Sequence, residues 1–297
     1  MNVRIKLGVV AASVAALALS ACGSSSLSGE PGGGASAPSV SVSQNVDLAS
    51  KLPESIKSAG VIKIGTDPTY APSEFLAADG KTVEGFDVDL FNQVAAKFGV
   101  KTEWQPSKFG SIITGVNGKK YDMGISSFTI NPDRLKQVDM VKYFNAGTQW
   151  ATQKGNPKGV DPDNACGKNI AVQTGTVQEN PDLSTRQKKC GSNKINVLSY
   201  DSQAQATSAV VTGKADAMLA DSPVVAYAVL QTGGKLEALG DIYDAAPYGY
   251  VIEKDQTEFA QAVADAVQAL ITDGTYKTIL DKWGVQAGAI DNPAVNP

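Results

Sequence analysis

The chain has 297 residues, of which 42% are hydrophobic and 19% are charged, and its formal net charge is −4. This length accommodates two lobes rather than one core, and the composition is that of a globular protein. No basic block occurs, so we expect no nucleic-acid partner. The sequence contains no histidine. The commonest general base and the commonest metal ligand are therefore both missing, which disfavours an enzyme and a metal centre.

The first 21 residues predict a lipoprotein signal peptide. Arg4 and Lys6 precede an apolar run from Leu7 to Ala21 that is too short to cross a bilayer. Cys22 follows directly, in an arrangement that resembles a bacterial lipobox, where this cysteine is lipidated and becomes the mature N-terminus. The alternative is an ordinary secretory signal with a chance cysteine. Lipidation would anchor the protein to the outer face of the cell membrane.

Residues 22–51 predict a flexible tether. Gly, Ser, Ala and Pro dominate between Gly23 and about Ser43. Such a segment cannot bury enough apolar surface to offset the entropy lost on ordering. We therefore expect the folded part to begin near Leu52, held away from the membrane by this tether.

Strands and helices alternate from Leu52 onwards, as judged from hydrophobic periodicity and from Gly and Pro breaks. This alternation predicts parallel α/β sheets, in which ligands bind beyond the carboxyl ends of strands. The predicted strands are 61–64, 102–105, 122–126, 169–173, 195–198 and 216–220, and the predicted helices are 85–99, 110–116, 203–211, 224–230, 259–271 and 275–283.

The loop after the first strand contains Asp67 and Tyr70 in the stretch GTDPTYAPSEF. An Asp-Pro pair is common in ordinary turns, so this loop has a purely structural interpretation. In a binding site, Tyr70 would offer a stacking surface and Asp67 would read a polar ligand group.

The stretch SSFTINPDR follows the strand at 122–126. Asn131 is a good N-cap with Pro132 at the first helical position, so Arg134 falls in the first helical turn beside free backbone N–H groups. A cation is disfavoured at this positive end of the helix dipole, so its presence there suggests that it binds an anion. A guanidinium binds a carboxylate in bidentate fashion. Ser127 and Thr129 could add contacts. The alternative is a solvated arginine next to a capped turn.

Two further strand ends carry polar residues. After 169–173, Thr176 and Glu179 have capping-box spacing, and Pro181 makes the helix short or kinked. After 216–220, Asp221 is either a plain N-cap or the partner of a ligand ammonium. Together these loops offer a cation and hydroxyls on one side and a carboxylate on the other. This arrangement complements an α-amino acid, whose two charged groups can be buried only when both are paired.

Cys166 and Cys190 are the two remaining cysteines of an exported chain. A disulfide between them is the expected state. Two cysteines without histidine do not make a recognisable metal-ligand set. We expect neither a metal nor a cofactor.

From about Val61 to Trp283 the sequence resembles the amino-acid-binding proteins of bacterial ABC transporters, of the histidine-, lysine/arginine/ornithine- and glutamine-binding type. The stretches that carry the resemblance are IGTDPTYAP, GFDVDL, DMGISSFTINPDR, TGT, GKADAMLAD and DGTYKTILDKWG. One departure is Ser73, which precedes Glu74 where the family usually has an aromatic residue.

The resemblance assigns a role to each loop. Arg134 would clamp the ligand carboxylate with the Thr176 and Val177 amides, and Asp221 would hold the ammonium. Aromatic rings would sandwich the ligand side chain, and Asp67 would contact its polar end, which favours a basic or amide amino acid. The complete ligand-binding set comprises Asp67, Tyr70, Phe109, Ser126, Ser127, Thr129, Arg134, Thr176, Val177, Gln178 and Asp221.

The resemblance also implies a two-lobed α/β fold of the periplasmic-binding-protein type (type II). Lobe 1 would comprise residues 52–150 and 247–297, and lobe 2 residues 151–246, with hinges near 149–153 and 245–249. Such a protein, expected to be a monomer, captures a small-molecule amino acid and hands it to an ABC permease. The alternatives are an enzyme on the same fold, resembling cyclohexadienyl dehydratase, with Glu179 or Asp67 as the base, or a ligand-sensing receptor subunit.

Overall fold

The computed structural model describes residues 43–297, which build one eight-stranded mixed sheet and a small three-stranded sheet. The strands of the large sheet are, in spatial order, β5 (Lys101–Pro106), β1 (Val61–Thr66), β6 (Met123–Gly124), β11 (Leu236–Glu253), β7 (Val138–Gln153), β10 (Ala217–Asp221), β8 (Asn169–Gln173) and β9 (Asn196–Tyr200). The small sheet contains β2 (Thr69–Tyr70), β3 (Glu74–Leu76) and β4 (Val83–Glu84).

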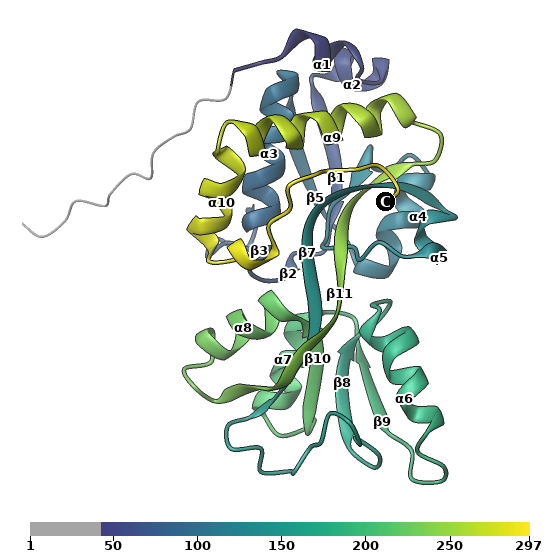
Figure 1. The fold of residues 1–297 in the computed structure, drawn as a ribbon, viewed down its shortest axis with the longest axis vertical. Helices are drawn as coiled ribbons and strands as arrows, with labels where there is room; N and C mark the ends of the chain where they lie inside the picture. The colour runs from purple at the N-terminus through teal and green to yellow at the C-terminus, as the bar shows by residue number, and fades with distance from the viewer. Residues whose placement is uncertain (1–42) are drawn as a thin grey trace, which may run out of the picture. The chain divides into compact units, whose positions relative to one another are not determined.

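The long strands β7 and β11 run antiparallel to each other through both halves of the large sheet (Figure 1). One half, here called the first lobe, contains the parallel strands β5, β1 and β6. The other half, the second lobe, contains the parallel strands β10, β8 and β9. The register between β7 and β11 is irregular from Leu239 to Tyr243 and from Tyr243 to Ala246. The predicted lobe boundaries and hinges remain predictions.

Helices cover both lobes (Figure 1). The helix predicted over 85–99 forms as α3, which ends at Gly99 in the left-handed conformation that glycine adopts readily. The helices are α1 (Val46–Ser50), α2 (Glu54–Ala59), α3 (Phe86–Phe98), α4 (Ile112–Asn117), α5 (Pro132–Leu135), α6 (Ser184–Lys188), α7 (Gln203–Val211), α8 (Ser222–Gln231), α9 (Thr257–Thr272) and α10 (Thr275–Trp283).

The folded chain begins before Leu52, inside the segment predicted to be a tether. The side chain of Asn45 accepts hydrogen bonds from the Asp47 and Leu48 amides and caps α1. Leu48 is buried in the core of the first lobe, which holds this short helix in place. The predicted signal peptide at 1–21, Cys22 and most of the tether lie outside the described residues.

Strand alternation divides the second-lobe core into two layers. Ala217 and Leu219 of β10 pack on one face with Trp150, whereas Met218 and Ala220 pack on the other. Because both faces of β10 are buried, its sequence AMLAD is apolar until its last residue. That last residue, Asp221, therefore marks the edge where the core ends.

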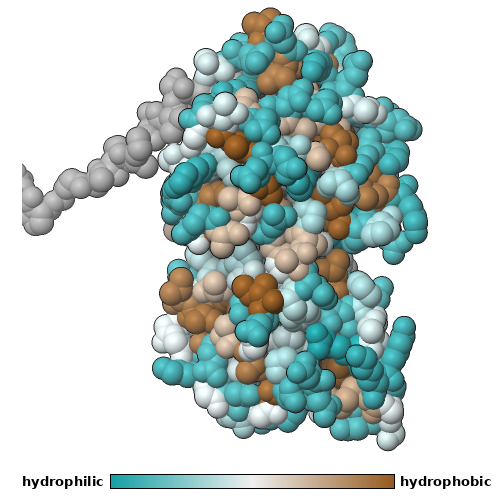
Figure 2. Space-filling model, viewed as in Figure 1, coloured by the Kyte–Doolittle hydropathy of each residue, from teal (hydrophilic) through white to brown (hydrophobic). Residues whose placement is uncertain are grey.

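No helix within residues 43–297 combines the length and the apolar character needed to cross a bilayer. Figure 2 shows hydrophilic residues over most of the visible face, with small hydrophobic patches between them. Four large hydrophobic side chains of the described region are well exposed, namely Val46, Leu76, Leu230 and Ile242.

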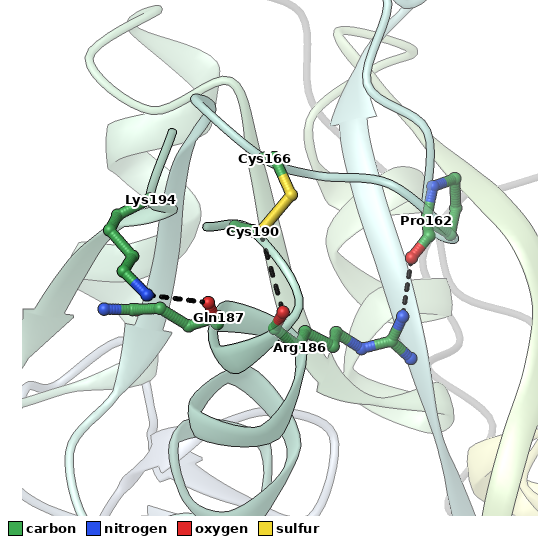
Figure 3. The surroundings of a disulfide bond; sticks show 6 residues. All are labelled: Pro162, Cys166, Arg186, Gln187, Cys190 and Lys194. Carbon is green, nitrogen blue, oxygen red and sulfur yellow. Dashed lines mark hydrogen bonds between the residues drawn. A yellow bond between two sulfur atoms is a disulfide. The ribbon is translucent and has the colours of Figure 1, made fainter. Parts of the chain in front are cut away.

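The predicted disulfide is confirmed. Cys166 and Cys190 are bonded, and the bond joins the loop before β8 to the end of α6 (Figure 3). Beside it, Arg186 donates to the Pro162 carbonyl at 2.6 Å and Lys194 donates to the Gln187 carbonyl at 3.3 Å. The bond and its neighbours thus hold α6 against the loop that enters β8.

Replacing both Cys166 and Cys190 with serine is expected to lower the free energy of unfolding by about 3 kcal/mol, because the sequence separation of 24 closes a loop of moderate length. Calorimetry of the variant should show a midpoint lowered by roughly 6–12 °C. Wild-type protein under reducing conditions should shift to the same midpoint. An unchanged midpoint in both would mean that the bond does not contribute to stability.

Candidate amino-acid site between the lobes

One cavity lies between the two lobes, at the carboxyl ends of their parallel strands. It is lined by all eleven residues predicted from the sequence and by one residue that was not predicted, Gln173. The lining residues are Asp67, Tyr70, Phe109, Ser126, Ser127, Thr129 and Arg134 from the first lobe and Gln173, Thr176, Val177, Gln178 and Asp221 from the second.

Arg134 is positioned by the short helix α5. The Asn131 side chain accepts hydrogen bonds from the amides of Asp133 and Arg134, and Pro132 occupies the first turn, as predicted. These caps fix the start of the helix, so the Arg134 side chain leaves it at a defined angle. It points toward the cavity rather than into solvent and is only 8% exposed.

The guanidinium of Arg134 lies over two aromatic rings. Its central carbon is 5.3 Å from the Phe109 ring centre and 5.2 Å from that of Phe128, and these two rings stack at 4.5 Å. It donates to the carbonyl of Thr129 at 2.7 Å and to that of Gly175 at 3.2 Å. Burial lowers the pKa of Arg134 to about 10, although the negative charge of Asp221 acts to raise it. The group still carries its charge at neutral pH.

Asp221, at the end of β10, presents a buried carboxylate to the same cavity. Its Oδ2 accepts a hydrogen bond from the Tyr70 hydroxyl at 2.8 Å, and its Oδ1 accepts one from the Gln178 amide at 2.8 Å. Burial raises its pKa, while the nearby Tyr248 hydroxyl and the hydrogen bonds from Tyr70 and Gln178 act in the opposite direction. The Tyr70 bond crosses from the first lobe to the second.

Asp67 and Gln173 meet across the cavity. Gln173 Nε2 donates to Asp67 Oδ2 at 2.6 Å, the Phe109 amide donates to the same oxygen at 3.2 Å, and the Thr69 hydroxyl donates to Oδ1 at 2.8 Å. Burial raises the pKa of Asp67, and these hydrogen bonds oppose the shift. Sequence reasoning missed Gln173 because it treated this residue only as the end of a buried strand. The available signal was a polar residue at that end.

The backbone is strained at Ser127, which has a φ of 51° without being glycine. Such conformations persist where the surroundings enforce them, and they occur often at binding sites. Here the strain lies between Ser126, which follows β6, and Thr129, which bridges to Tyr248 of β11. The segment 126–129 is therefore held from both sides against the cavity.

The second-lobe wall begins just after β8. The Thr176 hydroxyl donates to the Gln173 carbonyl, and the Glu179 amide donates to the Thr176 hydroxyl oxygen at 3.3 Å. The following helical segment Gln178–Leu183 is interrupted at Asn180, so the predicted break is confirmed. Glu179 accepts from the Gly175 amide and from the Ser199 hydroxyl and does not line the cavity.

The cavity therefore offers a buried cation to an anion and a buried carboxylate to a cation. Neither Arg134 nor Asp221 takes part in an ion pair within residues 43–297. Buried charges are normally paired, so both favour binding of an oppositely charged group. The aromatic rings and the Asp67–Gln173 pair complete a wall for a third, polar group.

Residues 62–286 match the bacterial extracellular solute-binding proteins, family 3. The chain belongs to this family. It is similar to the arginine-binding protein ArgT of Corynebacterium glutamicum, with 35% identity over 84% of this chain and 83% of that protein. The comparisons thus confirm the predicted family resemblance.

Solved structures agree with this assignment. An ancestral arginine-binding protein bound to arginine has 31% identity and a TM-score of 0.71, covering 75% of this chain and 98% of that one. An ancestral amino acid-binding protein described as a precursor of cyclohexadienyl dehydratase has 31% identity and a TM-score of 0.69, covering 77% and 98%. The predicted two-lobed α/β fold is confirmed by these neighbours.

Proposed function

We propose that this protein captures a polar L-amino acid between its lobes and delivers it to an ABC permease. Arg134 binds the α-carboxylate as a bidentate partner, with the backbone amides of Thr176 and Val177 beside it. Asp221 binds the α-ammonium, together with the Thr129 hydroxyl and the Ser127 carbonyl. The observation that carries the proposal is one cavity with a buried guanidinium and a buried carboxylate, neither of which forms an ion pair within residues 43–297.

The ligand side chain has a basic or amide head group, and arginine is the first candidate. Asp67 accepts donors from a head group, and the Gln173 amide offers both a donor and an acceptor next to it. Tyr70 and Phe109 cover the aliphatic part of the side chain. The similar protein ArgT of Corynebacterium glutamicum, with 35% identity, is named as arginine-binding, which supports this choice.

Ligand binding favours the closed arrangement of the lobes. Four hydrogen bonds already cross between the lobes at the cavity: Tyr70 hydroxyl to the Asp221 carboxylate, Asp221 amide to the Tyr70 hydroxyl, Gln173 to Asp67, and Arg134 to Gly175. An amino acid that contacts both lobes makes all its contacts only when they are closed, so it shifts the population toward that form. The permease then recognises the closed shape.

The cellular location that we propose rests on the predicted lipoprotein signal peptide. The mature protein begins at a lipidated Cys22 and works outside the cytoplasm as a membrane-tethered monomer. Binding needs no covalent step, metal or cofactor. Asp67 and Asp221, the two carboxylates that line the cavity, are both held by hydrogen-bond donors, as suits ligand recognition.

Thermal unfolding of the purified mature protein with each of the twenty amino acids, ornithine and citrulline tests the proposal. A ligand at a hundredfold excess over its dissociation constant stabilises the native state by about 2.7 kcal/mol. We expect a clear shift with arginine and with few other compounds. If none of these compounds raises the midpoint, the proposed function is wrong.

A further inference from the structure

Two buried carboxyl groups lie directly behind the cavity, outside the set that lines it. Glu74 is on β3 and Asp87 is in the first turn of α3, and both are 0% exposed. They come from the stretches APSEF and GFDVDL, whose acidic residues have no role in the ligand contacts proposed above. Fully buried carboxyl groups are rare unless they are paired or neutral.

The backbone brings these two groups together. The Phe86 amide donates to the Pro72 carbonyl at 3.0 Å and the Asp87 amide donates to the Ser73 carbonyl at 3.1 Å, so the segment before β3 docks on the start of α3. Gly85 permits this close approach, because a Cβ there would lie 2.1 Å from the Ser73 carbonyl oxygen. The side chains of Glu74 and Asp87 consequently become hydrogen-bonding neighbours.

Within residues 43–297, one oxygen of each carboxyl group in the pair lacks a hydrogen-bond partner, and a single proton between these two oxygens would supply it. Glu74 Oε1 accepts from the Ser126 hydroxyl at 2.9 Å, and Asp87 Oδ2 accepts from the Tyr143 hydroxyl at 2.6 Å. The remaining oxygens, Glu74 Oε2 and Asp87 Oδ1, receive no other hydrogen bond in the described structure. A proton on Glu74 Oε2 that is donated to Asp87 Oδ1 would satisfy both.

The surroundings of the pair do not supply a cation. No lysine or arginine within residues 43–297 forms an ion pair with either carboxyl. Two negative charges there would repel each other in a medium of low polarity, so the pair carries at most one. The titratable groups that face the pair are Asp67 and Tyr70 near Glu74, and Tyr143, Tyr248, Tyr250 and Tyr276 near Asp87.

The single charge belongs on Asp87. This residue lies in the first turn of the 13-residue helix α3, whose free N–H groups stabilise a negative charge, and it receives the Tyr143 hydrogen bond. Burial raises the pKa of Asp87 to about 7, although the hydrogen bond from Tyr143 and the neighbouring Glu74 and Ser127 lower it. Burial raises the pKa of Glu74 well above its usual range, and the neighbouring Asp87 raises it further.

We propose that Glu74 and Asp87 share one proton and act as positioning residues for the amino-acid site, an inference that rests on the function proposed above. Ser126 links the carboxyl pair to the wall of the cavity, because its hydroxyl donates to Glu74 and accepts a hydrogen bond from the Asp67 amide at 3.0 Å. Ser127, with its strained backbone, lies next to Asp87. The pair thereby fixes both serines and the start of the loop that carries Asp67.

The first test concerns the proton and needs no ligand. The pKa of Glu74 is raised in the folded state, so the retained proton stabilises the protein at low pH, and this contribution is lost as the pH rises. In urea unfolding between about pH 5.5 and 8, the unfolding equilibrium constants of the wild type and of Glu74→Gln are compared. The ratio of the wild-type constant to the variant constant should rise about tenfold per pH unit. Equal slopes would overturn the shared proton. Glu84→Gln, an exposed residue on β4, should keep the wild-type slope.

The second test concerns positioning. In Glu74→Leu the Ser126 hydroxyl loses its acceptor, and arginine affinity measured by calorimetry should fall at least tenfold. Glu74→Gln can accept from Ser126 and donate to Asp87, so it should restore affinity to within about threefold of the wild type. Wild-type affinity in Glu74→Leu would overturn the positioning role. If wild-type protein binds no amino acid, the proposed function fails, while the pH slopes still decide whether the proton is shared.

Discussion

Replacing Arg134 with alanine is expected to weaken amino-acid binding by roughly 30-fold to several thousandfold. The variant leaves the ligand carboxylate buried without its charged partner, a loss of about 2 to 5 kcal/mol. Arg134 is 8% exposed and lies over Phe109 and Phe128, so water cannot replace the guanidinium freely. Calorimetric titration with arginine, or with whichever amino acid raises the unfolding midpoint, measures the effect.

Two further variants separate charge from geometry. Arg134→Lys keeps a positive charge but loses the planar fork of donors, so we expect it to bind more weakly than the wild type and better than alanine. Lys136, the C-cap of the same short helix, is exposed and pairs with the exposed Asp133, so Lys136→Ala should bind normally. Binding by Arg134→Ala within threefold of the wild type would contradict the carboxylate assignment.

Much of the site could be predicted because its residues follow strand ends. Asp67, Ser126 and Asp221 come directly after apolar strand-like runs, and parallel strands bring their carboxyl ends to one edge. The N-cap at Asn131 is enough by itself to place Arg134 in the first turn of a helix. Local rules sufficed here because each of these residues is positioned by its own strand or helix.

Other features could not be predicted, because they depend on contacts between distant segments. Gln173 becomes part of the site only through its 2.6 Å hydrogen bond to Asp67 of the other lobe. Glu74 and Asp87 meet because backbone amides of α3 dock on carbonyls of the preceding segment. The full lengths of β7 and β11 depend on their pairing with each other, which the sequence of neither strand shows alone. Helix α1 likewise requires burial of Leu48 in the core.

Replacing Asp221 with asparagine is expected to weaken amino-acid binding at least about a hundredfold while leaving the ligand-free protein as stable as the wild type, or more stable. The α-ammonium loses its only charged partner among the residues that line the cavity at that end. In the absence of ligand, however, burial raises the pKa of Asp221, which means that keeping this carboxylate charged opposes folding. Asparagine removes that cost and can still bond with Tyr70 and Gln178.

The opposite directions of these two effects distinguish a binding role from a structural one. If Asp221 served mainly as the N-cap of α8, its replacement would lower the unfolding midpoint, yet its side chain makes no capping hydrogen bond with that helix. Paired measurements of arginine affinity and ligand-free unfolding, with the exposed Asp241→Asn as the control in the same lobe, decide between the roles. A destabilised Asp221→Asn that still binds arginine normally would assign the residue to the fold. Lost affinity with unchanged or raised stability would assign this charge to ligand binding, and raised stability would show that it is kept at the expense of the fold.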